Sequence, residues 1–332
     1  MSDDLLEHII ATITPGSRAQ ALGIEQRLAK RGGKKLGVLH DLATRVAAAR
    51  HSPNPDVAKK AIVICAADHG VADPGVDLGL DSPACAAALH IGDGKAAVCA
   101  LAHSANAQVI VVDCGIRGAA NHDLGAAVID LRIADGSNDI RRGPALSLEA
   151  ATRAVQTGVA LCYSLADETN DGLDVLALGN IGPGAYPASA AIVSVMTGTS
   201  AHDLDDGDEA IAAALSTNLV DKSRPLDVLA KLGGCDIGVL TGLILGAASI
   251  NVPVVLDSHA TSAAALIAVA LAPGTADYLL ASHGGGNAAH QVALESLSLS
   301  AVFDLGLAHG EGAGAAMILP FVDRAIELTR DS

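Results

Sequence analysis

The apolar residues of the chain alternate between short continuous runs and longer stretches with helical spacing. The short runs are rich in β-branched residues and predict buried parallel strands at 61–66, 108–113, 173–178, 252–256 and 278–281. The longer stretches predict helices over most of 1–50, at about 83–103, at 149–166, from about 188, at 207–217, 235–249 and 261–271, and over much of 288–330. Because strands and helices alternate, we expect a mainly parallel sheet with helices on both faces.

Polar residues follow the ends of several predicted strands. Asp68 and His69 come after the first strand, Asp257 after the fourth, and Ser282 and His283 after the fifth. These residue types suit acid–base chemistry or metal binding, but they also cap loops. The loop at 282–287 lacks the G-x-S-x-G elbow of a serine hydrolase, so an anion-binding nest is the better interpretation. Ligands bind beyond the carboxyl ends of parallel strands, so we expect a small-molecule site here.

The third predicted strand runs into a glycine- and proline-rich loop at 179–187, which contains Asn180, Gly182 and Gly184. A helix is predicted directly after it. The free N–H groups at a helix N-terminus can bind an anion, and the two glycines would let the backbone approach a phosphate. The loop has neither the G-x-G-x-x-G nor the P-loop pattern. A tight turn between a strand and a helix therefore remains an alternative.

The strongest candidate for chemistry is Glu311, which lies in a glycine-rich stretch between Gly310 and Gly312. A single carboxylate among glycine and alanine has few structural reasons to exist. Burial would raise its pKa and suit it to accept a proton near neutral pH. The alternative is a glutamate favoured at the start of a helix by the macrodipole. We expect Glu311 to be catalytic and its two glycine neighbours to bind substrate.

Composition narrows the class of protein. The chain has 332 residues, of which 50% are hydrophobic and 17% charged, so it can bury a large core. Its formal net charge of −16 argues against a nucleic-acid partner. The six cysteines form no C-x-x-C pair, and no signal peptide is recognised, so we expect a cytoplasmic protein. No uninterrupted apolar run reaches the length of a membrane span, and we expect none.

Neither a metal nor a cofactor is expected. The twelve histidines are scattered, and none forms an H-x-x-x-H pair or a His/Cys set at metal-binding spacing.

Seven segments, in this order, resemble the nicotinate-nucleotide:dimethylbenzimidazole phosphoribosyltransferase family. The most specific are Ala66-Ala-Asp-His-Gly-Val71 and the stretch at 304–316, which frames Glu311. The others lie at 35–43, 143–145, 232–237, 253–257 and 261–265. The resemblance covers most of the chain.

The resemblance implies a homodimer whose subunit has a large Rossmann-like domain, at 55–285, and a smaller helical domain from both chain ends, at 1–54 and 286–332. It implies transfer of phosphoribose from nicotinate mononucleotide to a nitrogen of an aromatic base similar to dimethylbenzimidazole, with inversion at the anomeric carbon. The product would supply the lower ligand of cobalamin. Glu311 matches the general base of the family.

Several positions depart from the family pattern. Asn180 stands where the family has a second glutamate, and alanine occupies position 308, where it has an arginine. A family lysine corresponds to Gly207–Glu209, and a glutamine of the base pocket falls at about Ala86.

These departures leave a second hypothesis open. A catalytically weak paralogue would bind an aromatic base or a nucleotide as a subunit or regulator. Substitute cations for a phosphate could come from Arg141, Arg142, Lys222 or Arg224.

Overall fold

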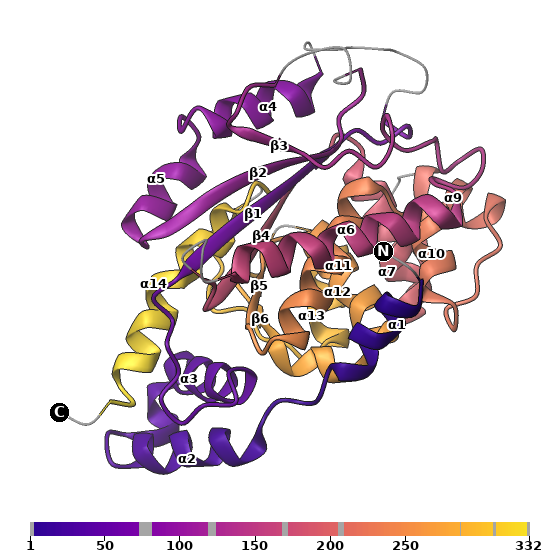
Figure 1. Ribbon diagram of the computed structural model, residues 1–332. Coiled ribbons are helices and arrows are strands. Elements are labelled where there is room, and N and C mark those ends of the chain that lie inside the picture. Colours follow the sequence, from indigo (N-terminus) through magenta and orange to yellow (C-terminus); the bar gives the residue numbers. More distant parts are fainter. Residues whose placement is uncertain are drawn as a thin grey trace.

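The computed structural model describes residues 3–72, 82–118, 124–167, 172–204, 209–285, 287–307 and 310–330. Six strands form one sheet: β1 (Lys60–Ala67), β2 (Ala107–Gly115), β3 (Val128–Asp130), β4 (Val175–Ile181), β5 (Val254–Leu256) and β6 (Leu279–Ala281). Their order is β3-β2-β1-β4-β5-β6, and every neighbouring pair is parallel. The predicted parallel Rossmann-like sheet is confirmed (Figure 1).

Fourteen α-helices are found within the described residues. They are α1 (Asp3–Thr12), α2 (Arg18–Ala29), α3 (Val38–Ala49), α4 (Pro83–Gly92), α5 (Ala97–Ser104), α6 (Leu148–Ala166), α7 (Ala185–Thr197), α8 (Ala201–Leu204), α9 (Glu209–Thr217), α10 (Pro225–Leu232), α11 (Cys235–Ser249), α12 (His259–Leu271), α13 (Ala288–Ser296) and α14 (Ala313–Glu327). The described residues also form two 3-10 helices, Gly33–Leu36 and Pro273–Tyr278.

The sheet separates two hydrophobic layers. Along β1, Val63 and Cys65 belong to the layer formed with α6, α7, α11 and α12. Ile62 and Ile64 belong to the opposite layer, formed with α3, α4, α5 and α14 (Figure 1). Side chains alternate between the two faces of a strand, so a strand covered on both faces is apolar throughout. This explains why β1 is a continuous apolar run in the sequence.

Helices from the two ends of the chain lie side by side. The N-terminal helix α3 packs against α2, and it also contacts α14, which is close to the C-terminus. Helix α14 in turn contacts α5 and β4. The last long helix therefore links the N-terminal helices to the middle of the sheet.

All five predicted strands exist, and the differences are local. The strand β3, at the edge of the sheet, was not predicted because it has only three residues, two of them exposed. The short helix α10 was also not predicted. The predicted loop at 179–187 is shorter than expected, because Gly179 and Asn180 belong to β4 and α7 already begins at Ala185. Pro187 is tolerated there because it lies in the first turn of the helix.

The stretch Pro83–Ser104 is long and apolar enough to cross a membrane, judged by length and composition alone. In the structure it is divided between α4 and α5. Gly94, with a φ of +75°, lies between the two helices. The prediction of one continuous helix at about 83–103 is therefore wrong, because a turn at Asp93–Gly94 separates two helices.

Helices α6 and α11 approach each other closely through two glycines. A methyl group on Gly158 would overlap the carbonyl oxygen of Val239, and one on Gly242 would overlap the carbonyl oxygen of Val155. Backbone therefore lies directly against backbone here, and neither neighbour can move as a flexible side chain could.

We expect Gly158→Ala to lower the free energy of unfolding by about 1–3 kcal/mol or more, because the added methyl group separates α6 from α11. Gly23→Ala is the matched control, since Gly23 lies in α2 with no atom within 4 Å of the added group. That control should stabilise the protein by up to about 1 kcal/mol. Urea unfolding measures both changes, and equal effects would contradict the close contact.

Candidate active site

The sheet reverses its direction of growth between β1 and β4. The chain builds outward from β1 to β3, then returns to β4 and builds outward to β6 on the other side. In sheets of this kind the crevice at the carboxyl ends of the two central strands binds ligands. Asp68 and His69 follow β1, and Asn180 is near the end of β4, so three of the predicted site residues come from this place.

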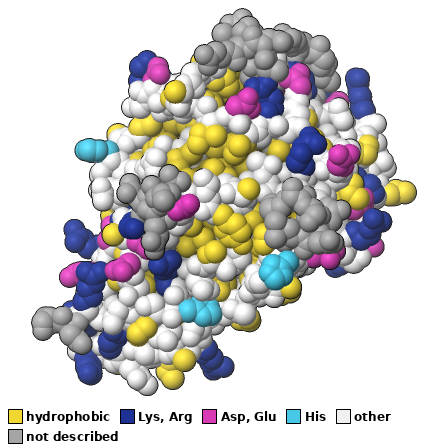
Figure 2. Space-filling model, viewed as in Figure 1, with side chains coloured by type: hydrophobic (Ala, Val, Ile, Leu, Met, Phe, Trp, Pro, Cys, Tyr) yellow, Lys and Arg dark blue, Asp and Glu magenta, His cyan; other side chains and the backbone are white. Residues whose placement is uncertain are grey.

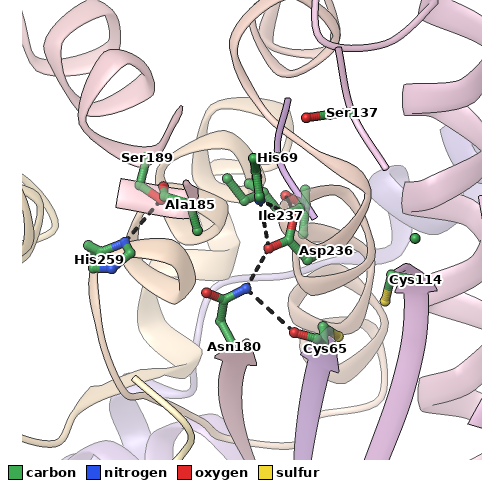
Figure 3. Close-up of polar contacts among 12 residues, drawn as sticks. Cys65, His69, Cys114, Ser137, Asn180, Ala185, Ser189, Asp236, Ile237 and His259 are labelled. Carbon is green, nitrogen blue, oxygen red and sulfur yellow. Dashed lines mark hydrogen bonds and ion pairs between the residues drawn. The ribbon is translucent and has the colours of Figure 1, made fainter. Parts of the chain in front are cut away.

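A buried polar network occupies the crevice (Figure 3). The His69 Nε2 atom lies 3.1 Å from the carboxylate of Asp236, and the Asn180 side-chain amide donates to the same carboxylate. The amide also donates to the carbonyl oxygen of Cys65, at 3.5 Å. Asp236 is fully buried in the first turn of α11, where the helix dipole favours a negative charge. The network therefore surrounds one carboxylate with an imidazole, an amide and a helix N-terminus.

Three glycines allow this network to form. A side chain at Gly182 would lie 3.1 Å from an oxygen of Asp236 and 3.3 Å from Nε2 of His69. Gly184 has a φ of +80°, which favours glycine, and a methyl group there would lie 3.1 Å from the β-carbon of His69. A side chain at Gly234 would overlap the His69 ring. The predicted loop glycines thus have a packing role around His69.

The Asp68 carboxylate is held by groups from two other segments. It accepts hydrogen bonds from the Ser82 hydroxyl, at 2.9 and 3.1 Å, and from the backbone N–H of Arg117, at 2.9 Å. Ser82 also caps α4, because its oxygen accepts from the N–H of Ala84 at 3.2 Å. Asp68 therefore ties the end of β1 to the start of α4 and to the loop after β2.

The second half of the site is the glycine turn that carries Glu311. The N–H of Asn180 donates to the carbonyl oxygen of Gly310, at 2.9 Å. A side chain on Gly179 would lie 2.6 Å from the nitrogen of Gly312, so the turn lies directly on β4. Gly312 has a φ of +81°, which suits glycine. Glu311 is thereby placed at the carboxyl end of β4.

The Glu311 side chain is partly exposed. Among the described residues its carboxylate has no hydrogen-bond or ion-pair partner, whereas the other carboxylates of the site are engaged. Positions 308 and 309, which precede the turn, lie outside the described residues. A partly buried carboxylate without a protein partner is available to a ligand.

Asp257 holds the glycine turn in place through hydrogen bonds to its backbone. Its two carboxylate oxygens accept hydrogen bonds from the N–H groups of Gly312, at 3.1 Å, and Ala315, at 2.8 Å. Complete burial raises the pKa of Asp257 from its usual 3.8 to about 7. The backbone N–H groups oppose that shift, and the nearby charge of Glu311 adds to it. Asp257 was predicted to bind substrate, but its bonds are to the turn that carries Glu311.

Ser282 and His283 lie at the end of β6. The Ser282 hydroxyl is fully buried and donates to the carbonyl oxygen of Leu256, at 2.7 Å. His283 is also buried, and neither of its ring nitrogens has a hydrogen-bond partner within the described part of the chain. Burial lowers the pKa of His283. Its ring packs against Gly314, where any side chain would overlap it. Ser282 thus holds β6 to β5, and His283 supports the start of α14.

Two site residues were missed in the sequence. Asp236 gave no distinct signal in the sequence, because a carboxylate in the first turn of a helix is common. His259 is the first residue of α12 and comes three residues after the end of β5. Its Nδ1 atom is 3.2 Å from the hydroxyl oxygen of Ser189. Its only sequence signal is its position just past the end of a predicted strand.

The possible substitute cations either pair with Asp139 or lie in an exposed turn. Arg141 and Arg142 both pair with Asp139, at 2.8 and 3.5 Å. Lys222 and Arg224 are exposed in the turn before α10. Positions 207 and 208 lie outside the described residues. No cluster of metal-binding side chains occurs within the ranges that the structure describes.

Protonation of the buried Asp257 should make the free energy of unfolding depend on pH. Because the folded-state pKa is above the unfolded value, its stabilising contribution is complete below about pH 4 and is lost as the pH rises to about 7. We expect the difference in unfolding free energy between the protein and Asp257→Asn to fall over that range, by at most about 1.4 kcal/mol per pH unit.

Urea unfolding at several pH values measures this difference, with Asp56→Asn, an exposed aspartate, as the control. The control should show a difference in unfolding free energy that does not change with pH. The same result for Asp257→Asn would show that Asp257 is ionised throughout this range.

Comparisons with known proteins give the same assignment over nearly the whole chain. A family model described as phosphoribosyltransferase matches residues 10–332. The chain is 37% identical over 339 residues to a nicotinate-nucleotide–dimethylbenzimidazole phosphoribosyltransferase from Roseiflexus sp. (strain RS-1), covering 98% of this chain and 94% of the relative. It is 34% identical over 345 residues to the protein of that name from Geobacter metallireducens, covering 98% and 95%.

A crystal structure of the protein of the same name from Thermus thermophilus superimposes with a TM-score of 0.86 and 29% identity, covering 95% of this chain and 97% of the other. The fold and the sequence therefore agree, and the chain belongs to the nicotinate-nucleotide–dimethylbenzimidazole phosphoribosyltransferase family.

Proposed function

We propose that this protein transfers phosphoribose from nicotinate mononucleotide to a nitrogen of an aromatic base similar to dimethylbenzimidazole, and that Glu311 is the general base. The observation that carries this proposal is the Glu311 carboxylate on its glycine turn. It is partly buried at the carboxyl end of β4, and it lacks a partner among the described residues. Family membership supports the choice of donor and acceptor.

The reaction needs one proton acceptor. A nitrogen of the base forms a bond to the anomeric carbon, the bond from that carbon to the nicotinate nitrogen breaks, and its electron pair stays on nicotinate. Glu311 takes the N–H proton of the base, so the new nucleotide leaves without an additional positive charge. A positioned general base contributes about 10²–10⁴-fold to such a step. Holding both substrates in line in the crevice supplies the orientation that the reaction also requires.

The polar residues of the site divide into two groups in this proposal. Asp257 and Ser282 are fully buried and bonded to backbone, so they shape the site. Asn180 and the backbone of Gly310 lie beside Glu311 and are proposed to contact substrate.

The same proposal assigns the remaining predicted residues to the walls of the substrate site. They are Asp68, His69, Gly182, Gly184, His283 and Gly312.

We also propose that the protein acts as a cytoplasmic homodimer. Hydrophobic side chains gather in the middle of the face seen in Figure 2, with charged side chains around them. A hollow of about 480 Å³ lined by Leu6, Ile10, Leu148 and Leu226 adds apolar surface between α1, α6 and α10. Exposed apolar surface of this kind is typical of contacts between subunits.

Glu311→Gln should lower the turnover number by two or more orders of magnitude, because glutamine cannot accept the proton of the base. The assay mixes the protein with nicotinate mononucleotide and dimethylbenzimidazole and follows nicotinate release by chromatography. Glu25→Gln, an exposed residue of α2, is the control and should retain full activity. Full activity of Glu311→Gln would remove Glu311 from the proposed role.

Calorimetric titration tests whether the donor is recognised through its phosphate. We expect nicotinate mononucleotide to bind at least about tenfold more tightly than nicotinate riboside, since a charge-assisted hydrogen bond to phosphate is worth about 1.5–3 kcal/mol. Equal affinities would contradict a phosphoribosyl donor. Tight binding of nucleotide and base without nicotinate release would instead favour the catalytically weak paralogue.

A further inference from the structure

Two polar atoms face the crevice without a hydrogen-bond partner among the described residues. One is Oδ1 of Asn180, near the end of β4, and the other is Nε2 of His259, which follows β5. The two strands are neighbours in the sheet. Asn180 is only 6% exposed as a residue, but neither of these two atoms belongs to the fully buried unpartnered atoms of the described residues, so both can be reached by a ligand or water.

The orientation of the Asn180 amide follows from its partners. Its nitrogen faces the Asp236 carboxylate and the Cys65 carbonyl, and both of these groups can only accept hydrogen bonds. The nitrogen must therefore stay on that side. The carbonyl oxygen is on the opposite side of the amide, toward His259 (Figure 3).

The tautomer of His259 follows in the same way. The Ser189 hydroxyl donates its one proton to the carbonyl oxygen of Ala185, at 2.7 Å. It can therefore only accept from His259, whose Nδ1 lies 3.2 Å away, so the ring proton is on Nδ1 and Nε2 is left as an acceptor. The rings of Tyr186 and His259 pack edge to face, with their centroids 5.3 Å apart.

His259 stays neutral at physiological pH. Burial and the nearby His290 lower its pKa to about 4, against a smaller opposing effect of Asp236. Nε2 therefore keeps its lone pair. Glu311, on the turn bonded to Asn180, adds a third acceptor to the same crevice.

We propose that Asn180 and His259 form a specificity-determining pair that recognises a hydrogen-bond donor, a hydroxyl or amino group, on a bound substrate. This inference rests on the proposed function and concerns the same crevice. The donor group has two possible sources, which are a substituent on the aromatic base and a ribose hydroxyl of the nucleotide. A substituent that can only accept would face two lone pairs and would be disfavoured.

Calorimetry with the full chain tests the pair through two ligand comparisons. The first compares a hydroxy-substituted benzimidazole with its methoxy analogue, and the second compares nicotinate mononucleotide with analogues that lack one ribose hydroxyl. In at least one comparison we expect the donor-bearing ligand to bind about tenfold or more tightly, as for a site built to bond a hydroxyl. The comparison that shows the preference identifies the source.

Variants connect the preference to the two residues. His259→Phe keeps the ring but removes Nε2, and it should reduce the preference to about twofold or less. Ser189→Ala should also reduce it, because Nδ1 loses its fixed acceptor and the ring can then carry its proton on Nε2. Ser216→Ala is the matched control, since the Ser216 hydroxyl also donates to a carbonyl of its own helix, in α9, and it should change nothing.

Nitrogen NMR of His259 measures which ring nitrogen carries the proton. A purely structural role of the residues around it would not change that result. The unmodified protein should show a protonated Nδ1 and an unprotonated Nε2, and Ser189→Ala should show a mixture. The proposal is overturned if no ligand binds, if neither comparison shows a preference, or if the preference survives His259→Phe in a protein that still folds by circular dichroism.

These outcomes are separate from those that test the transfer reaction. Binding needs no turnover, so a preference without nicotinate release would contradict the proposed transfer reaction alone. Nicotinate release without any preference would contradict the specificity pair alone.

Discussion

The site depends on the direct contact between the glycine turn at 310–314 and the end of β4. A side chain at Gly179 would lie 2.6 Å from the nitrogen of Gly312, so the turn and the strand meet without side chains between them. Asp257 holds the turn from β5 through two backbone N–H groups. The position of Glu311 is therefore set by backbone contacts, which are stiffer than contacts between side chains.

The three carboxylates near that contact, Asp257, Asp236 and Glu311, are held in different ways. Asp257 is buried so completely that its pKa rises to about 7, and the charge of Glu311 contributes to the rise. Asp236 is stabilised differently, by His69, by the Asn180 amide and by the N-terminus of α11. The carboxylates that support the structure are thus bonded to protein groups, and Glu311 is left available to a substrate.

Much of the fold could be predicted from the sequence, because a parallel sheet covered on both faces leaves continuous apolar runs that are easy to recognise. Edge strand β3 escaped prediction because only one of its three residues is buried. Glu311 could be singled out for a similar reason, since a lone carboxylate among glycines contradicts the local pattern. The hydrogen bonds of Asp257 could not be predicted. Its partners lie 55 or more residues away, and they are backbone N–H groups, which leave no signal in the sequence.

The specificity pair lies further from what a sequence can reveal. Whether Nε2 of His259 accepts or donates depends on Ser189, and the role of Ser189 depends in turn on a carbonyl one helical turn earlier. The orientation of Asn180 depends on Asp236, which comes from another helix. Each residue type permits both orientations, and only the chain of partners excludes one. In this proposal, substrate choice depends on proton positions fixed by neighbouring residues, whereas the proposed general base, Glu311, can be recognised from its residue type and its glycine neighbours.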